Sequence, residues 1–133
     1  MWSALSRHQN FALLVLRVVL GGMFILHGFP KIIGGPEKWQ KIGSAMDYAG
    51  VHSLYGFFGF MAAFSEFFGG IAVVLGVMFR PAALLMATTM TVAALMHLGK
   101  GDGVLGAAHA IEVGAVFFAL VFIGPGALSL DKK

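Results

Sequence analysis

The sequence predicts an all-α integral membrane protein: a four-helix bundle with a short interfacial helix in its first loop. Three observations predict this class. Hydrophobic residues make up 59% of the 133 residues and charged residues only 11%, less than half of the roughly 25% found in soluble domains. The mean hydropathy is +0.88, and a soluble chain of this size could not bury so much apolar surface. Four apolar stretches, each long enough to cross about 30 Å of hydrocarbon, divide the chain.

The four apolar stretches are expected to be transmembrane helices. They cover residues 11–30, 54–78, 81–98 and 104–123. Strands are excluded because an alternating barrel pattern is missing, and irregular backbone in lipid would leave amides unsatisfied. Arg17 interrupts the first stretch and no Ala-x-Ala cleavage pattern follows it, so we expect a retained helix and not a signal peptide. Residues 1–133 are expected to form one domain.

The links between the stretches are short except the first. An Arg-Pro dipeptide joins the second stretch to the third, and a Gly-rich polar turn joins the third to the fourth. In the long loop 31–53, Pro36 and Gly50 bracket a short helix. Its apolar side consists of Trp39, Ile42, Met46 and Ala49. We expect this helix to lie on the membrane surface or to cap the mouth of the bundle.

Charge and cysteine content exclude several classes of function. The formal net charge is +3, but the nine lysines and arginines are scattered, so they form no stripe that would bind nucleic acid. Cysteine is absent, which excludes disulfides, thiolate metal sites and dithiol redox chemistry. No covalently bound cofactor is expected. Any redox role would need a bound cofactor.

The apolar stretches and the charge distribution also predict the cellular location and the partners of the protein. We expect an integral protein of a bacterial-type cytoplasmic (inner) membrane, with both termini on the same side, and the compact N-terminal face favours the cytoplasm. The lipid bilayer is the first partner. Four short helices offer a thin interior, and their Gly-rich faces suit close packing. The sequence therefore favours a homo-oligomer or a partner membrane or peripheral subunit.

Seven ionisable side chains lie within the apolar stretches or near their ends. A charge near the bilayer centre costs about 2.5 kcal/mol or more, so these groups should face the bundle and find partners. We take them as candidates for ligand binding or proton relay. They are Arg17, His27, Lys31, Glu66, His97, His109 and Glu112.

Helical geometry gathers these side chains on faces of the predicted helices. At 100° per residue, one stripe of the first helix carries two cations and two glycines. This stripe consists of Arg17, Gly21, Phe24, Gly28 and Lys31. Glu66 lies midway along the second stretch, among small residues that let a neighbour approach closely. His109 and Glu112 share a face of the fourth helix, and His97 ends a weaker polar stripe on the third.

Two interpretations of these residues are open. In the first, Arg17 pairs with Glu66 or Glu112 in a structural ion pair that locks helix register, and one carboxylate is left for other work. In the second, the polar groups line a pocket for a lipid headgroup, a quinone carbonyl or a proton path.

Metal binding is a weaker alternative. His109 and Glu112 could supply two ligands from one helix face, and two facing histidines could hold haem. The paired Glu-x-x-His motifs of di-iron bundles are missing, so we expect no metal site. The residues able to complete such a site are Glu66, His97 and His27.

Several short motifs, in order along the chain, resemble one known family. They are Arg17 with Gly21, His27-Gly28-Phe29-Pro30-Lys31, Glu66-x-x-Gly69-Gly70, Leu75-Gly76-x-x-x-Arg80-Pro81-Ala82, Glu112, and Gly124-Pro125-Gly126-Ala127-Leu128-Ser129-Leu130-Asp131. Together they resemble the DoxX family over about residues 10–131. The resemblance covers nearly the whole chain.

The resemblance implies a small four-span membrane protein. The family takes its name from a subunit associated with a terminal quinol oxidase, related DoxD-type chains belong to a thiosulfate:quinone oxidoreductase, and other members are linked to oxidative-stress complexes. It thus implies a quinone-linked subunit of a membrane oxidoreductase, with quinone as the non-covalent cofactor. His109 or Arg17 would donate to a quinone carbonyl, and Glu66 or Glu112 would pass a proton. The alternative is a non-enzymatic membrane scaffold, or a binder or carrier of a lipophilic small molecule.

Overall fold

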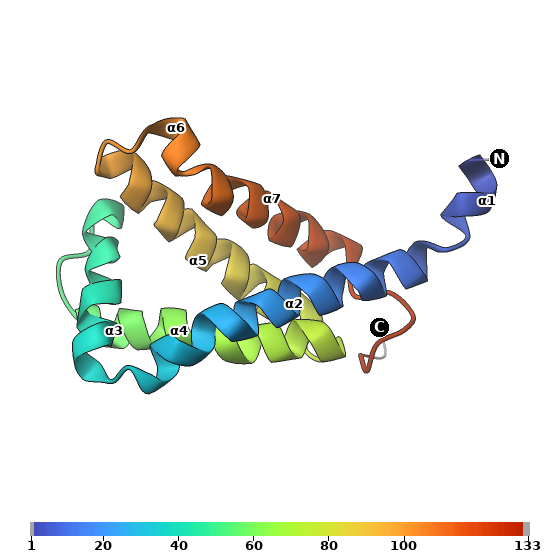
Figure 1. The fold of residues 1–133 in the computed structure, drawn as a ribbon, viewed down its shortest axis with the longest axis horizontal. Coiled ribbons are helices and arrows are strands. Elements are labelled where there is room, and N and C mark those ends of the chain that lie inside the picture. Colours follow the sequence, from blue (N-terminus) through green and yellow to red (C-terminus); the bar gives the residue numbers. More distant parts are fainter. Residues whose placement is uncertain (1, 132–133) are drawn as a thin grey trace.

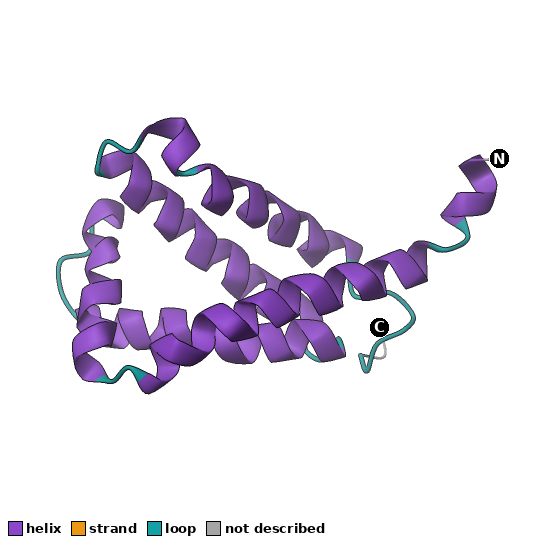
Figure 2. Ribbon diagram, in the orientation of Figure 1, coloured by secondary structure: helices purple, strands orange, loops and turns teal. Residues whose placement is uncertain are grey.

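The computed structural model describes residues 2–131, and within them the chain forms helices and no strand (Figure 2). The elements are α1 (Trp2–Ser6), α2 (Gln9–Ile33), α3 (Pro36–Gly43), η1 (a 3₁₀ helix, Ser44–Ala49), α4 (Tyr55–Leu75), α5 (Phe79–Gly99), α6 (Gly103–Gly106) and α7 (Ala108–Ile123). Helices α2, α4 and α5 are long and apolar enough to cross a membrane, and α7 is apolar but shorter. The predicted all-α membrane bundle is confirmed.

The fourth predicted stretch differs most from the structure. We expected one helix over 104–123, but the chain breaks at Ala107 into the four-residue α6 and the 16-residue α7. The reason is local, because Gly103 and Gly106 bracket α6 and glycine is a poor helix former. At about 1.5 Å per residue α7 is about 24 Å long, which is less than the hydrocarbon thickness of a bilayer.

The long helices form two pairs that converge at one end of the molecule and separate at the other (Figure 1). Helix α2 packs along α4, and α5 packs along α7. Helix α3 and η1 lie across the separated end, where α3 packs on α4 and η1 on α5. We call the separated end the wide end and the other the narrow end. Both ends of the described chain lie at the narrow end (Figure 1).

The apolar core connects the two helix pairs. Phe24 of α2 meets Phe117 of α7 edge to face, with 5.5 Å between the ring centroids. The large apolar side chains that are fully buried come from α4, α5 and α7 and are Val73, Phe79, Met86, Phe117 and Leu120. Edge-to-face rings and fully buried apolar side chains are stabilising, so this core holds the pairs together.

Glycines allow the closest helix contacts. A Cβ on Gly21 of α2 would lie 2.6 Å from the carbonyl oxygen of Gly70 on α4, and a Cβ on Gly28 would lie 2.5 Å from the amide nitrogen of Phe67. Gly21 and Gly28 belong to the stripe that the sequence predicts for the first helix. Four of the five residues of that stripe, Arg17, Gly21, Phe24 and Gly28, are the buried residues of α2, and the fifth, Lys31, is half-buried.

A second glycine contact fixes the short helix of the first loop. A Cβ on Gly59 of α4 would overlap the carbonyl group of Trp39, and one on Gly43 of α3 would overlap the carbonyl of Tyr55. Backbone therefore meets backbone between α3 and α4. Together with the position of η1 against α5, this contact makes the loop helix a cap over the wide end of the bundle.

Candidate functional site: two pockets that share an ion pair

A Lys31–Glu66 ion pair lies at the wide end, between α2 and α4. The Lys31 ammonium donates to both carboxylate oxygens, at 2.8 and 3.1 Å. The Glu66 side chain is 7% exposed and that of Lys31 is 32% exposed. Gly28, one turn before Lys31, lets the backbone of α2 lie against that of α4 at Glu66. Trp39 of α3 donates its indole N–H to the Lys31 carbonyl at 2.9 Å, so the cap helix also holds this end of α2.

The predicted pairing of Arg17 with Glu66 or Glu112 is wrong. The Arg17 guanidinium is buried at the narrow end, and none of the ion pairs within residues 2–131 includes it. It donates to four main-chain carbonyls, those of Val73 at 3.0 Å, Val74 at 2.7 Å, Pro125 at 3.2 Å and Leu128 at 2.7 Å. Because α2 and α4 are antiparallel, Arg17 lies beside the end of α4, and Lys31 lies beside Glu66.

The narrow end carries two further polar contacts. The Asp131 carboxylate accepts from the backbone N–H groups of Met78 and Phe79, both at 2.8 Å, and so caps α5. Arg80 donates to the carbonyls of Val121 and Phe122 at the end of α7. Sequence reasoning missed the cap, because an N-cap is normally adjacent to its helix and Asp131 is 52 residues from Phe79. The family motif that ends at Asp131 is the signal that could have indicated it.

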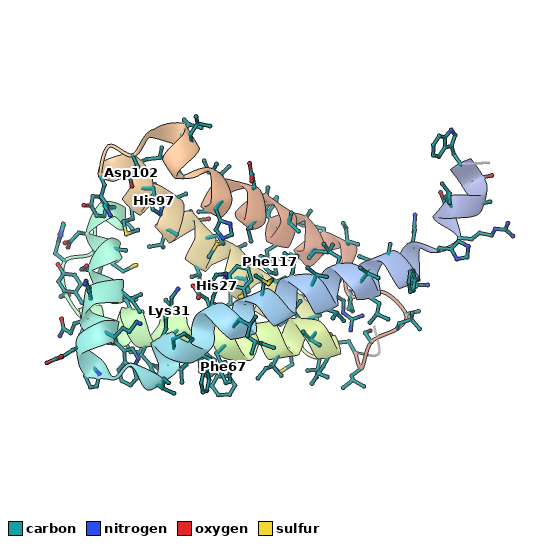
Figure 3. All side chains as sticks on the ribbon, in the orientation of Figure 1. His27, Lys31, Phe67, His97, Asp102 and Phe117 are labelled. Carbon is teal, nitrogen blue, oxygen red and sulfur yellow. The ribbon has the colours of Figure 1, made fainter. Side chains whose placement is uncertain are left out.

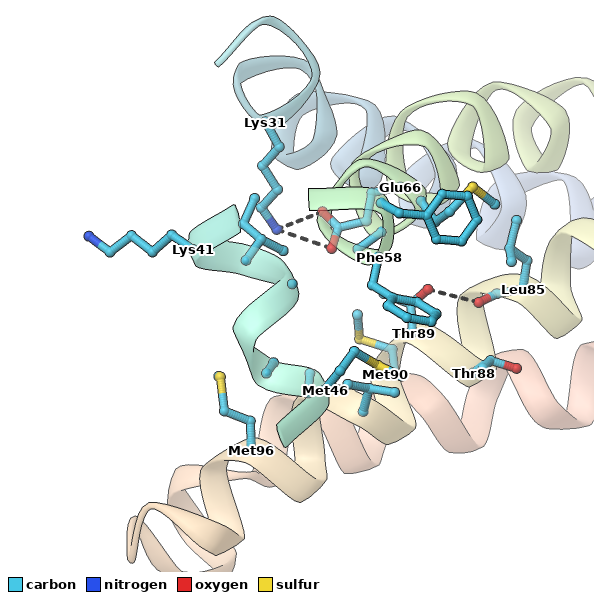
Figure 4. A pocket seen from close by; sticks show the side chains of 18 residues that line it. Lys31, Lys41, Met46, Phe58, Glu66, Leu85, Thr88, Thr89, Met90 and Met96 are labelled. Atoms are coloured by element: carbon cyan, nitrogen blue, oxygen red, sulfur yellow. Dashed lines mark hydrogen bonds and ion pairs between the residues drawn. The ribbon is translucent and has the colours of Figure 1, made fainter. Parts of the chain in front are cut away.

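A pocket of about 500 Å³ lies between α3, η1, α4 and α5. We call it the cap pocket. Its walls are mostly apolar, with Phe58, Met90 and Met96 among them, and Figure 4 shows Lys31 and Glu66 together at one side. Thr89 also lines it; its hydroxyl donates to the Leu85 carbonyl at 2.9 Å. The ammonium group of Lys41, another lining residue, points away from Glu66 (Figure 4).

A second pocket of about 320 Å³ lies between α2, α5 and α7. We call it the histidine pocket, because His27, His97 and His109 line it together with Lys31 and Glu66. The Nδ1 atom of His97 lies 2.8 Å from the Oδ2 atom of Asp102, near α6 (Figure 3). The two pockets share Lys31, Glu66, Met90, Ala93 and Met96. The ion pair thus lies at the boundary between an apolar pocket and a polar one.

The structure brings five of the seven candidate residues together. His27, Lys31, Glu66, His97 and His109 line the two pockets. Arg17 lies at the narrow end, and Glu112 is exposed on α7 and lines neither pocket. Over residues 2–131 no group of three or more His, Cys, Asp or Glu side chains is placed to hold a metal ion. The role of these residues in ligand binding or proton transfer stays a prediction.

Comparison with known proteins decides the family. The DoxX family model matches residues 12–99. The chain belongs to the DoxX family. The matched region runs from α2 to the end of α5, so it contains Arg17, Lys31 and Glu66 and the whole lining of the cap pocket.

Relatives match over nearly their whole length. A Haemophilus influenzae protein named only as uncharacterized is 31% identical, over 97% of this chain and 95% of its own. The inner membrane protein YqjF of Escherichia coli K12 is 30% identical, over 96% of this chain and 95% of its own. The inner membrane protein YphA of the same organism is 27% identical, over 91% of this chain and 89% of its own. No solved structure matches the chain. The relatives and the apolar helices together support an integral inner-membrane protein.

Proposed function

We propose that this DoxX protein binds a lipophilic small molecule with a polar head group in the cap pocket, and that the ligand is a quinone. The observation that carries the proposal is the pocket itself, which is apolar on most sides and has an ion pair at one wall. Its volume of about 500 Å³ lies within the range of about 300–1,000 Å³ that is typical of small-molecule sites.

The polar groups of the cap pocket fit a quinone head. A lysine ammonium has three N–H donors, and Glu66 accepts two of those of Lys31, so one remains for a ligand carbonyl. The Thr89 hydroxyl donates its hydrogen to Leu85 and accepts from the Ser65 hydroxyl at 3.1 Å, so its second lone pair remains for a ligand hydroxyl. Phe58 and the methionines Met90 and Met96 offer ring and thioether surfaces for an apolar ring. The residues present therefore suit both the carbonyl and the hydroxyl form of a quinone.

On this proposal the chain is the quinone-binding subunit of a membrane oxidoreductase. A quinone, when bound, supplies two-electron, two-proton chemistry. The chain's own residues bind and orient the ring, and the α3 cap keeps water away from its apolar side. The chain has no cysteine, so a thiol of this chain is not the electron donor. We propose a partner protein as that donor.

The first test is extraction and titration. The protein is purified in mild detergent, its absorption spectrum is recorded, and extracted small molecules are identified by mass spectrometry. We expect stoichiometric quinone. A short-chain quinone added at 100 times its dissociation constant should stabilise the delipidated protein by about 2.7 kcal/mol, measured as a rise in Tm. A wild-type Tm that does not respond to quinone contradicts the proposal.

Two variants test the site within that measurement. Lys31→Met should abolish the rise in Tm, because the donor to the ligand carbonyl is lost, while Lys38→Met should keep it, because Lys38 is exposed and lines neither pocket. Equal responses of the two variants would place the ligand elsewhere. Glu66→Gln separates binding from the scaffold alternative: a folded variant with weakened quinone binding supports the proposal, whereas failure to fold supports a scaffold role.

A further inference from the structure

We propose that the histidine pocket is a water-filled chamber through which Glu66 exchanges protons with the aqueous phase near α6. The inference rests on the proposed function, because a quinone in the cap pocket takes up and releases protons. It adds a role for the second pocket and for three histidines that ligand binding does not use.

The chemistry of the lining supports water in this chamber. His27 comes from α2, His97 from α5 and His109 from α7. His97 lies against Asp102, whereas His27 and His109 are exposed residues that line the pocket. Polar groups in a membrane protein need partners, and a pocket of about 320 Å³ has room for several waters. Water is the partner that satisfies these imidazoles.

The break between α6 and α7 lies at the edge of the chamber. The helix is interrupted at Ala107, and the neighbouring residues Gly106 and His109 line the chamber. Ala107 is buried, and its N–H and carbonyl still bond to Gly103 and Ile111, so the break turns the helix without leaving unpaired backbone. The short α7 also brings His109, in its first turn, towards the membrane edge.

The position of Glu66 connects the two pockets. Its carboxylate lines both, so a proton can reach it from the chamber and leave towards a ligand in the cap pocket. The charged and titratable groups that line the pockets around it are His27 and Lys31 from α2, Lys41 from α3, His97 from α5 and His109 from α7. When Glu66 gives up a proton, the O–H bond of its carboxyl group breaks and a new bond to hydrogen forms on a water oxygen or an imidazole nitrogen. When Glu66 takes up a proton, the reverse occurs. No electrons move in this step.

The absence of native cysteine makes the chamber directly testable. In proteoliposomes, His27→Cys places a thiol at an exposed position of the histidine pocket, and Leu26→Cys places one at nearly the same depth of α2 on a residue that is 69% exposed and lines neither pocket. A charged, water-soluble thiosulfonate reagent should modify His27→Cys at least about tenfold faster, because thiols react as thiolates, which form in water and not in lipid. Equal rates would overturn the chamber.

A third thiol separates this inference from the proposed function. Ala62 lines the cap pocket but not the histidine pocket. A short-chain quinone should slow labelling of Ala62→Cys by a membrane-permeant maleimide and leave His27→Cys reactive. If quinone does not protect Ala62→Cys while His27→Cys still outpaces Leu26→Cys, the proposed ligand fails and the chamber stands.

Proton exchange is measured separately. At a pH low enough to protonate Glu66, its infrared carboxyl band, assigned by its loss in Glu66→Gln, should shift rapidly on transfer to D₂O. His109→Phe, which replaces an imidazole of the chamber by an apolar ring, should slow the shift at least about tenfold, while His8→Phe, outside the long helices, should not. An unchanged rate in His109→Phe would exclude the route through His109.

Discussion

The two ends of α2 use a basic side chain in opposite ways. Arg17 at the narrow end is 1% exposed and donates to four carbonyls. Lys31 at the wide end, about 21 Å further along the helix axis, is 32% exposed and pairs with one carboxylate at the boundary of two pockets. The same helix face is therefore closed at one end and accessible at the other.

The difference follows from the chemistry of the two side chains. The last carbonyls of a helix have no partner within it, and the fork of a guanidinium can satisfy several of them at fixed geometry. A lysine ammonium is a compact charge on a flexible stem, so it can exchange one acceptor for another. We infer that the narrow end holds the fold together and that the wide end is adapted to a ligand.

The largest expected effect is at the narrow end. Arg17→Met should lower the free energy of unfolding by about 3 kcal/mol or more, because several buried carbonyls lose their donor and each costs about 1–3 kcal/mol. The measurement is thermal or denaturant unfolding in detergent, followed by circular dichroism. Glu66→Gln serves as the control at the wide end and should cost less. A larger loss in Glu66→Gln would reverse the comparison.

The second prediction tests how the wide end is closed. Gly59→Ala should destabilise the protein by about 1–3 kcal/mol and weaken binding in the cap pocket, because the new methyl group would overlap the Trp39 backbone and push α3 away. Gly56→Ala, one turn earlier on α4, is the matched control, since its methyl group would lie 3.8 Å from Gln40. Unfolding and quinone titration of both variants check this. Similar behaviour of the two would show that the cap does not depend on this contact.

The smallest effect concerns Asp47 on the outer side of the cap. Hydrogen bonds from Tyr55 and then His52 hold the pKa of Asp47 below its ordinary value of 3.8. A lowered folded-state pKa means that these contacts stabilise the fold above the ordinary value and are lost as the pH falls through the lowered one. Tyr55→Phe should raise the titration midpoint of Asp47, measured by NMR of its labelled carboxyl carbon. An unchanged midpoint would show that Tyr55 does not bond to Asp47.

Local features of this fold could be predicted from the sequence, and register could not. The stripe on the first helix depends only on the helical repeat, and four of its five residues, Arg17, Gly21, Phe24 and Gly28, are buried as expected. Which cation meets Glu66 depends on how far α2 is shifted along α4, and a loop of more than twenty residues does not determine that shift. The sequence therefore indicated the groups of the ion pair but assigned Arg17 in place of Lys31.

The fourth helix and the cap of α5 show the same limit. Hydropathy alone favours one continuous helix over 104–123. The structure instead breaks this helix at Ala107, next to Gly106, and places His109 in a pocket. The cap of α5 joins Asp131 to Met78, 53 residues apart. Such contacts depend on tertiary structure, so composition and periodicity do not report them.

The hydrogen bonds of Arg17 also have a consequence for biosynthesis, because Arg17 is made before some of its acceptors. Two of its acceptors, the carbonyls of Pro125 and Leu128, lie 108 and 111 residues later in the chain. At about 5–20 residues per second, the ribosome makes them roughly 5–20 s after Arg17. The first helix thus reaches the membrane with its guanidinium incompletely bonded. A nascent chain that stops before residue 125 lacks both acceptors, and we expect it to be open to degradation by membrane proteases.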